Sequence, residues 1–367
     1  MNTVSFSRSS SLPLTSYGWD ADWEATAAPY TEQGLTLGRV VRVDRGLCDI
    51  VTAEGTLRAD TALVTPRDPM KVLCTGDWAA VDTAAEPPLV RTYLPRRTAF
   101  VRNTSSKRSE GQILAANVDH AIIAVPLTGD LDLGRIERFL ALGWESGAQP
   151  LIALTKCDLV PDPVALSHLV EDVETTAPGV QVLPVSAAEG EGVEVLRAVV
   201  SGGTSVLLGP SGAGKSTLAN ALLGADVMDV QAIRDVDGKG RHTTTTRNLL
   251  ALPGGGVLID TPGLRGVGLW DAETGVGQVF SEIEELAEEC RFHDCAHEVE
   301  PGCAVLAALE EGSLSARRLE SYRKLIRENQ RLLAKTDARL RAEIRRDWRL
   351  KQAQGRAAME AKGRKLR

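Results

Sequence analysis

The 367-residue sequence is poor in aromatic residues and cysteines and has no long hydrophobic run. Six cysteines are too sparse for a disulfide scaffold, which excludes the small disulfide-stabilised secreted class. No apolar run approaches the roughly 18 residues of a membrane helix, and residues 1–20 lack the apolar segment of a secretory signal. The remaining composition is that of a globular protein, so we expect a cytoplasmic chain of about two or three domains that does not bind membranes. No feature demands more than a monomer.

The net charge of −7 is unevenly distributed along the chain. Residues 317–367 contain 18 Lys and Arg against 6 Asp and Glu, a local charge of +12, so the other 316 residues carry −19. A basic end on an acidic body is typical of proteins with a polyanionic partner. A solvated, charged helix would have the same composition, so the tail alone leaves both interpretations open.

The pattern of apolar residues predicts a multidomain α/β protein. Over residues 35–102 the segments are short, β-rich and separated by turns, which favours an OB-fold barrel, although an SH3-like barrel would leave similar traces. Over 103–272 apolar runs alternate with helical stretches, which predicts a parallel sheet covered by helices. We expect a helical domain over 273–345, a basic tail over 346–367, and a disordered or irregular arm over the Ser-containing residues 1–34.

A phosphate-binding loop lies in the second of these regions. The segment "GPSGAGKS" matches the pattern G-x-x-x-x-G-K-[ST] at every fixed position, after an apolar run and before a helical one. Its glycines would let backbone N–H groups surround phosphate oxygens, Lys215 should reach the β- and γ-phosphates, and the Ser216 hydroxyl should bind Mg²⁺. The residues predicted to contact nucleotide here are Gly209, Pro210, Ser211, Gly212, Ala213, Gly214, Lys215, Ser216 and Thr217.

Two later segments are typical of the switches that sense a γ-phosphate. The segment "VLIDTPG" ends an apolar run at Asp260, which would hold Mg²⁺ through water, while the N–H of Gly263 would approach the γ-phosphate. The segment "GKGRHTTTTRN" offers Thr243 or Thr244 for contact with Mg²⁺ and the γ-phosphate. Together with the phosphate loop, these segments predict a hydrolase for nucleoside triphosphates.

The elements that would read a guanine base precede the phosphate loop. The segment "TKCD" fits the [N/T]-K-x-D pattern of GTPases, in which the carboxylate accepts hydrogen bonds from guanine N1–H and N2–H₂ and rejects adenine. This disfavours an ATP-dependent enzyme. The segment "SAA" follows a further apolar run and would complete the base site. The predicted base-binding residues are Thr155, Lys156, Cys157, Asp158, Ser186, Ala187 and Ala188.

The order of these motifs, with base before phosphate, is the reverse of the usual one. Circular permutation explains it simply, because the termini of a compact α/β domain often lie close together and can be reconnected without loss of the sheet. The segment "CRFHDCAHEVEPGC" follows the switches and offers five candidate ligands for the four positions of a tetrahedral metal. Thiolates and imidazoles at this spacing in a cytosolic chain favour a structural zinc ion over disulfides.

In its order of motifs, the chain resembles the RsgA/YjeQ family of small-ribosomal-subunit-dependent GTPases over roughly residues 35–345. The stretches "AANVDHAIIAV" and "EPGCAV" are similar to other segments of that family. The resemblance implies an N-terminal OB-fold, a circularly permuted GTPase domain and a C-terminal zinc domain. It also implies rRNA binding, GTP hydrolysis stimulated by the small ribosomal subunit, and a role in late maturation of that subunit.

The family pattern C-x4-C-x-H-x5-C selects four zinc ligands and leaves His293 outside. The selected residues are Cys290, Cys295, His297 and Cys303. The sequence departs from the family at Thr155, where Asn is commoner, so a side-chain amide contact is lost and we expect weaker guanine binding. The first 30 or so and the last 20 or so residues lie outside the resemblance. A protein of another class, an RNA-binding adaptor with GTP as a structural ligand, would contain the same motifs.

The candidate catalytic residues are His242, Thr243 and Thr244. Ras-type GTPases place a water-orienting Gln where this chain has Leu264, which cannot orient water. His242 is the nearest alternative because imidazole can orient or deprotonate water at neutral pH, and the resemblance implies the same role. Contact of this histidine with RNA or solvent is the competing interpretation.

We expect His242→Ala to abolish the GTP turnover that small ribosomal subunits stimulate, while nucleotide affinity is kept, because the side chain acts on water and not on the nucleotide. Turnover with and without subunits, together with a nucleotide titration, measures both effects. Unchanged stimulated turnover would rule out the catalytic role.

Overall fold

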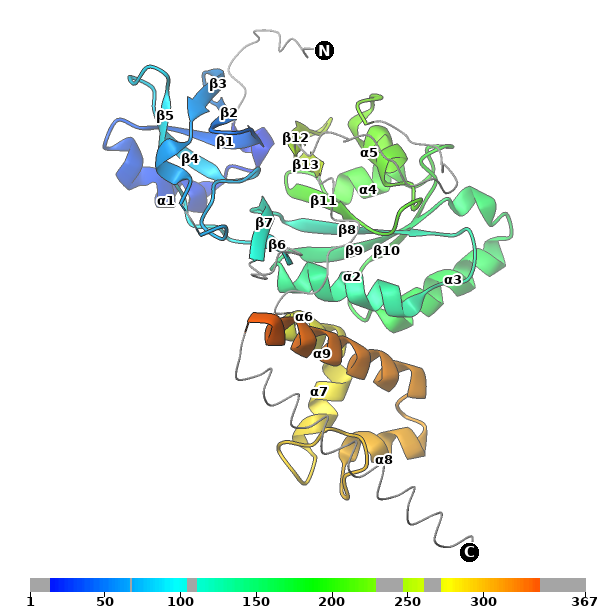
Figure 1. Ribbon diagram of the computed structural model, residues 1–367. Helices are drawn as coiled ribbons and strands as arrows, with labels where there is room; N and C mark the ends of the chain where they lie inside the picture. Colours follow the sequence, from blue (N-terminus) through cyan, green and yellow to red (C-terminus); the bar gives the residue numbers. More distant parts are fainter. Residues whose placement is uncertain (1–13, 67, 104–110, 229–246, 261–271, 337–367) are drawn as a thin grey trace, which may run out of the picture.

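In the computed structural model of the protein, the described residues are 14–66, 68–103, 111–228, 247–260 and 272–336. They form a small barrel, a sheet flanked by helices and a helical domain, arranged one after another (Figure 1). Among these residues no helix has both the length and the apolar character needed to cross a lipid bilayer. The predicted basic tail lies outside the described residues.

The described chain begins with a 3-10 turn, η1 (Leu14–Tyr17), and helix α1 (Ala21–Thr31). The Asp20 carboxylate accepts a hydrogen bond from the N–H of Trp23 (2.8 Å), which caps α1. Trp23 is buried and packs with Trp78 of the barrel. The prediction of an irregular arm is therefore wrong for this stretch, because its tryptophans supply an apolar face that anchors the helix.

Five strands form a closed barrel in the order β1-β2-β3-β5-β4, with β4 pairing back to β1. All of its neighbouring pairs are antiparallel except β3 with β5, which is the OB-fold arrangement. Val40, Ile50 and Val81 fill the interior without solvent exposure. The OB-fold prediction is confirmed. The strands are β1 (Thr36–Val43), β2 (Leu47–Thr52), β3 (Gly55–Asp60), β4 (Trp78–Asp82) and β5 (Leu89–Tyr93), and the turn η2 (Ala62–Val64) follows β3.

The second unit contains a six-stranded portion of sheet in the order β10-β9-β8-β11-β13-β12. The first five strands of this order are parallel and β12 is antiparallel to β13. The predicted parallel sheet is therefore confirmed. The strands are β8 (His120–Pro126), β9 (Gln149–Thr155), β10 (Val182–Val185), β11 (Thr204–Leu208), β12 (Asn248–Ala251) and β13 (Val257–Asp260).

Helices cover both faces of this sheet. Buried residues of α2 pack on one face, and those of α4 and α5 pack on the other. In α2, Ile136, Phe139, Leu140 and Gly143 recur at the spacing of an amphipathic helix, and Asp132 caps the start. The helices are α2 (Leu133–Glu145), α3 (Pro163–Thr176), α4 (Val193–Val199) and α5 (Lys215–Leu223), and the short turn η3 (Cys157–Leu159) precedes α3.

The second unit begins nearer to the N-terminus than the sequence predicted. Strand β6 (Ala99–Asn103) pairs with β7 (Gly111–Ala116) in a separate two-stranded sheet, and the N–H of Ala99 donates to the carbonyl of Ser146, just beyond α2. The predicted barrel boundary at residue 102 therefore assigned β6 to the wrong unit. Short β-rich segments look alike in sequence, and only their pairing distinguishes them.

The barrel is joined to the larger sheet by backbone and side-chain contacts. Strand β1 pairs with β12 at Arg42 and Asn248. The buried side chain of Arg39 extends from β1 and donates from Nη2 to the carbonyl of Asn117 (3.1 Å) and to Oγ1 of Thr204 (2.9 Å). These bonds connect the barrel to the segments that precede β8 and begin β11.

The C-terminal unit is helical and rests on α2. Its helices are α6 (Glu273–Val279), α7 (Ser281–Glu288), α8 (Ala304–Glu311) and α9 (Ala316–Thr336). Gly275 permits close approach of α6 because a Cβ at this position would clash with the carbonyl of Ala141. A buried ion pair joins Arg318 of α9 to Glu137 of α2 (2.7 Å), and Glu137 has no solvent exposure. The predicted helical domain is thus attached to the second unit.

Candidate nucleotide and metal sites

Four of the predicted site segments follow the carboxyl ends of parallel strands. The T-K-x-D segment follows β9, the S-A-A segment follows β10, the phosphate loop follows β11, and Asp260 ends β13. Only β8 separates β9 from β11, so the ends of the two strands that lead into the base-reading and phosphate segments lie about 10 Å apart across the sheet. This is the crevice in which open α/β sheets bind nucleotides.

The phosphate loop has the backbone that its glycines predict. Gly209, Gly212 and Gly214 all have positive φ angles, of 136°, 80° and 80°. A Cβ at Gly209 would lie 2.5 Å from the carbonyl oxygen of Ala124, so no other residue fits there. Gly214 is the N-cap of α5, whose first residue is Lys215. The loop therefore presents the N-terminus of a helix where a phosphate would bind.

The ammonium group of Lys215 lies over the same loop. It donates to the carbonyls of Gly209 (2.8 Å) and Pro210 (2.5 Å). A cavity of about 140 Å³ lies at this edge, between Pro210, the end of β8 and Phe139 of α2. The lysine is therefore positioned by the backbone that would surround the phosphates.

The base-reading segment is bonded directly to the phosphate loop. The hydroxyl of Thr155, which is 4% exposed, donates to the carbonyl of Ala213 (2.8 Å). Lys156 adopts a left-handed backbone (φ 61°), and its Cε lies 3.9 Å from the position of a Cβ built on Gly214. The lysine stem therefore passes beside the loop. Asp158 is exposed in η3, as a carboxylate that receives a base must be.

The remaining predicted base-site residues differ in burial and in their hydrogen bonds. Ser186 is fully buried and its hydroxyl accepts from the N–H of Glu189 (3.2 Å), so it shapes the turn that carries Ala187 and Ala188. Cys157 is 3% exposed and its thiol lies 3.8 Å from a carboxylate oxygen of Glu191. Its side chain is therefore buried and is not available for contact with a nucleotide.

The predicted magnesium ligands come from neighbouring elements. Ser216 lies in the first turn of α5 and Asp260 ends β13, which pairs with β11, and both residues are half-buried. Five further residues singled out in the sequence lie outside the described residues. They are His242, Thr243, Thr244, Gly263 and Leu264.

The cysteine and histidine segment folds into a compact cluster between α7 and α8. The ligand atoms of Cys290, Cys295, His297 and Cys303 all lie within 4.8 Å of one another. His297 Nδ1 is 3.6 Å from the sulfur of Cys290 and 3.4 Å from that of Cys303, and these two sulfurs are 3.8 Å apart. Metal–sulfur and metal–nitrogen bonds of about 2.3 and 2.1 Å give a tetrahedron with edges of this length.

The structure distinguishes the two histidines of this segment. His297 is 7% exposed and has a left-handed backbone (φ 56°), whereas His293 is exposed and outside the cluster. Cys303 also caps α8, because its sulfur accepts from the N–H of Leu306 (3.4 Å). The donor set of three thiols and one imidazole suits zinc.

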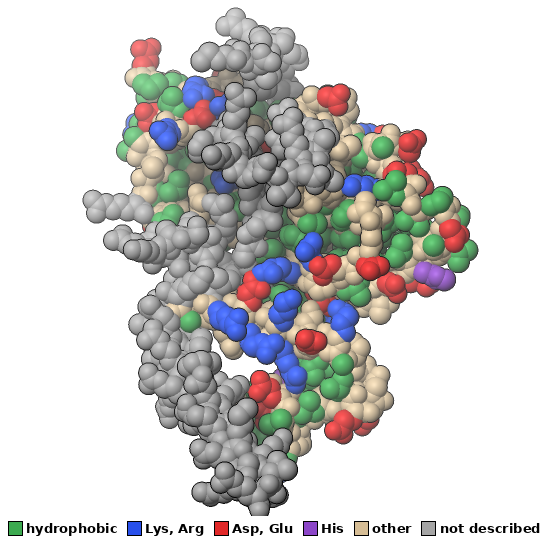
Figure 2. Space-filling model, turned by 45° about the vertical axis from the view of Figure 1, so that its right-hand side comes forward, with side chains coloured by type: hydrophobic (Ala, Val, Ile, Leu, Met, Phe, Trp, Pro, Cys, Tyr) green, Lys and Arg blue, Asp and Glu red, His purple; other side chains and the backbone are tan. Residues whose placement is uncertain are grey.

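The C-terminal unit has a basic surface. The sequence showed the excess of Lys and Arg in this region but not their arrangement on one face. Arg317, Lys324 and Arg331 of α9 are exposed and seven residues apart, and Arg327 is exposed beside them. This spacing places them on one face of the helix. Figure 2 shows Lys and Arg side chains gathered where the helical unit meets the larger sheet. We call Arg317, Lys324, Arg327 and Arg331 the α9 stripe.

Comparison with known proteins identifies the family. A family model described as RsgA GTPase matches residues 93–270. The chain is 77% identical over 354 residues to the small ribosomal subunit biogenesis GTPase RsgA of Streptomyces avermitilis, covering 96% of both chains. The corresponding protein of Streptomyces coelicolor is 75% identical over 360 residues and is covered to 98%. The chain belongs to the RsgA GTPase family. It is therefore a P-loop GTP hydrolase.

Two solved structures agree with the fold. YjeQ from Thermotoga maritima matches with a TM-score of 0.59 at 25% identity, over 80% of this chain and 98% of that one. YloQ, described as a circularly permuted GTPase, matches with a TM-score of 0.59 at 20% identity, over 81% and 95% of the two chains. The predicted circular permutation is confirmed.

The bond between Thr155 and Ala213 yields a direct test of how the base segment supports the phosphate loop. Thr155→Val keeps the side-chain shape and leaves the buried carbonyl of Ala213 without its donor, which costs about 1–2 kcal/mol. We expect affinity for GDP to fall by about 5- to 30-fold in a fluorescent-nucleotide titration. Thr155→Ser keeps the hydroxyl and is the control. Equal affinity of the two variants would show that the bond does not support nucleotide binding.

Proposed function

We propose that this RsgA-family GTPase acts in late maturation of the small ribosomal subunit, where it binds rRNA and hydrolyses GTP under stimulation by the subunit. The observation that carries the proposal is the meeting of the base and phosphate segments at one sheet edge, joined by the bond from Thr155 to Ala213. The relatives' name, small ribosomal subunit biogenesis GTPase, supplies the biological setting. In this proposal hydrolysis times release, and the protein is a cytoplasmic monomer.

In this proposal, different described residues bind the base, the phosphates and Mg²⁺. Asp158 receives the guanine edge, the stem of Lys156 lies along the base, and the loop from Gly209 to Thr217 holds the phosphates with Lys215 over them. Ser216 in the first turn of α5 and Asp260 at the end of β13 are half-buried and would hold Mg²⁺, which neutralises charge on the phosphate oxygens. Hydrolysis without the subunit is slow in this proposal because Leu264 cannot orient water.

The α9 stripe is a described surface suited to rRNA. Its four cations are exposed along one helix face, and RNA offers phosphates at regular intervals to such a face. Binding through phosphates releases counterions, so the affinity should fall steeply with salt. The alternative, an adaptor that uses GTP only as a structural ligand, is not favoured, because the chain belongs to a GTPase family.

Variants of the α9 stripe should weaken the stimulation of GTP turnover by the small ribosomal subunit. In Lys324→Ala/Arg331→Ala two phosphate contacts are lost, so we expect the subunit concentration for half-maximal GTP turnover to rise about tenfold and the salt dependence to become shallower by about 2 in log–log slope. Turnover without subunits should not change. The control Lys324→Arg/Arg331→Lys keeps both charges. Turnover that no subunit concentration stimulates in the unmodified protein would favour the adaptor.

We also propose a single structural zinc ion bound by Cys290, Cys295, His297 and Cys303. Three of the donor atoms, those of Cys290, His297 and Cys303, lie at tetrahedral distances from one another, and all four donors lie within 4.8 Å of one another. A set of four protein ligands leaves no position for a substrate. The ion would join the end of α7 to the start of α8.

The two histidines of the segment provide a matched pair for testing the zinc site. His297→Ala should lose the metal and part of the helicity of the C-terminal unit, because three ligands hold zinc much less tightly than four. His293→Ala should retain one zinc ion per chain. Metal content by mass spectrometry and far-ultraviolet circular dichroism measure both. Retention of zinc by His297→Ala would show that another residue completes the site.

A further inference from the structure

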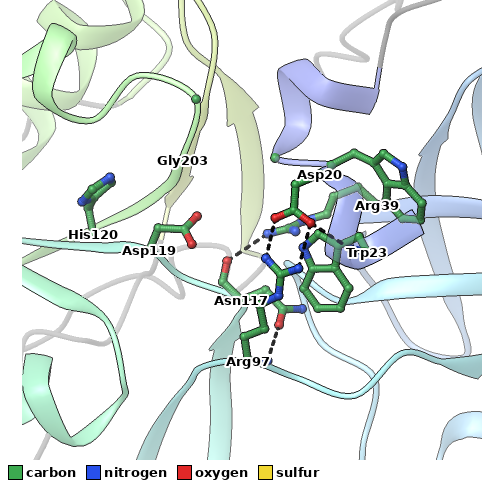
Figure 3. A pocket seen from close by; sticks show the side chains of 11 residues that line it. Asp20, Trp23, Arg39, Arg97, Asn117, Asp119, His120 and Gly203 are labelled. Atoms are coloured by element: carbon green, nitrogen blue, oxygen red, sulfur yellow. Dashed lines mark hydrogen bonds and ion pairs between the residues drawn. The ribbon is translucent and has the colours of Figure 1, made fainter. Parts of the chain in front are cut away.

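A cavity of about 240 Å³ lies at the junction of α1, the barrel and the GTPase sheet (Figure 3). It opens at the amino ends of two central strands, because His120 begins β8 and Gly202 and Gly203 directly precede β11. The nucleotide segments follow the carboxyl ends of these strands. The length of β11 separates cavity and phosphate loop by about 16 Å, so the cavity is a site of its own.

The charged groups of the cavity balance one another. Arg97 donates two hydrogen bonds to Asp20 (2.5 and 2.8 Å), and its guanidinium lies over the ring of Trp23, 4.1 Å from the centroid. The hydrogen bond from Arg97 lowers the pKa of Asp20 to about 2, so this pair stays ionised. Arg39 and Asp119 add one charge of each sign. A strongly charged ligand of either sign would therefore meet as much repulsion as attraction.

Arg39, which lines the cavity, has an unmatched hydrogen-bond donor. Arg39 is 1% exposed, and its Nη2 donates to Asn117 and Thr204. Its buried Nε has no acceptor among the described residues. Burial lowers the pKa of Arg39 to about 10, against the opposing effect of Asp119 and Asp77, so the group is still a cation at neutral pH. A buried guanidinium N–H without an acceptor is costly, and a ligand atom that accepts from it would remove that cost.

Asp119 contributes an acceptor on the opposite side. Its Oδ2 accepts from the N–H of Thr204 (2.7 Å), which fixes the carboxylate, and the residue is exposed. In Figure 3 the carboxylate is turned toward Asn117 and Arg97 and not toward the ring of His120. The cavity thus presents an oriented acceptor as well as a buried donor.

These features together select a ligand class. An apolar ligand would remove water from the exposed Asp119 carboxylate without replacing its hydrogen bonds, and it would leave the buried Nε of Arg39 without an acceptor. A flat heterocycle with neighbouring donors and acceptors on its edge would satisfy both groups. Trp19 is half-buried and Arg97 is exposed, and both are side chains on which such rings stack. We propose that the cavity binds one unstacked nucleobase of an RNA strand. That the base belongs to an RNA strand rests on the proposed function, in which the protein binds rRNA.

Short RNAs test the proposal with the full chain saturated with GDP and Mg²⁺, so that the GTPase site is filled. The probes are uridine hexamers whose third position carries A, C, G, U or no base, followed by fluorescence anisotropy of a labelled end and by tryptophan fluorescence. We expect the best base to bind about tenfold more tightly than the abasic strand, since one stacked base contributes about 1–3 kcal/mol. Equal affinity of all five hexamers overturns the proposal, and so does equal binding of free nucleosides.

A matched pair of variants assigns the effect to the cavity. In Asp119→Asn the side-chain amide oxygen can still accept the hydrogen bond from the N–H of Thr204. The side-chain NH₂ group, however, replaces the carboxylate oxygen that would accept from the base, so two donors would face each other. We expect Asp119→Asn to lose the difference between base-containing and abasic strands and to retain GDP affinity. Asp172→Asn makes the same charge change on the exposed surface of α3 and should behave like the unmodified protein. A base preference that survives in Asp119→Asn overturns the proposal.

The outcome is separable from that of the proposed function. Turnover stimulated by small subunits, measured on the same preparations, reports on the ribosomal role regardless of base preference. Stimulated turnover without base preference in the hexamers refutes the cavity proposal alone. Absence of both stimulation and hexamer binding refutes the ribosomal role and, with it, RNA as the source of the base.

Discussion

The parallel pairing of β9, β8, β11 and β13 is the constraint on which the rest of the structure depends. Each loop that follows a carboxyl end then lies at the same sheet edge, whatever its order along the chain. Circular permutation preserves this pairing, because it changes which strands are connected and not which strands are neighbours. The buried bond from Thr155 to Ala213 shows the result locally, since two segments 58 residues apart in sequence support each other.

The units on either side of this sheet are attached to elements that lead to the nucleotide edge. Asn248 of β12 pairs with Arg42 of the barrel on one side and with Asp260 on the other, so one ladder of strands runs from the barrel to a predicted magnesium ligand. The helical unit is attached through Glu137 and Arg318. Burial alone would lower the pKa of Arg318, but its hydrogen bonds to Glu282 and Glu137 raise it, so the ion pair persists. Such a buried pair opposes separation of the two units.

Much of the fold followed from patterns that are local in sequence. Short β-rich segments indicated the barrel, and apolar runs between helical stretches indicated the parallel sheet, because both patterns reflect burial of neighbouring residues. Two expectations were wrong for the same reason. The arm before residue 34 contains a helix held by Trp23, and β6 pairs with β7 and not with the barrel. In both cases contacts with distant residues decided the structure.

The sequence by itself determined the chemistry of this protein. A phosphate loop, a guanine-reading carboxylate and a cluster of thiols with imidazole are recognisable because each needs particular residue types at short spacing. Only the tertiary structure decided what is built from distant segments. Burial of His297 and exposure of His293 separate two ligands that the residues alone left equivalent, and Arg39, Arg97 and Asp119 meet in one cavity although they lie on different elements. Spacing along a chain specifies local conformation, whereas strand pairing and packing specify which distant side chains become neighbours.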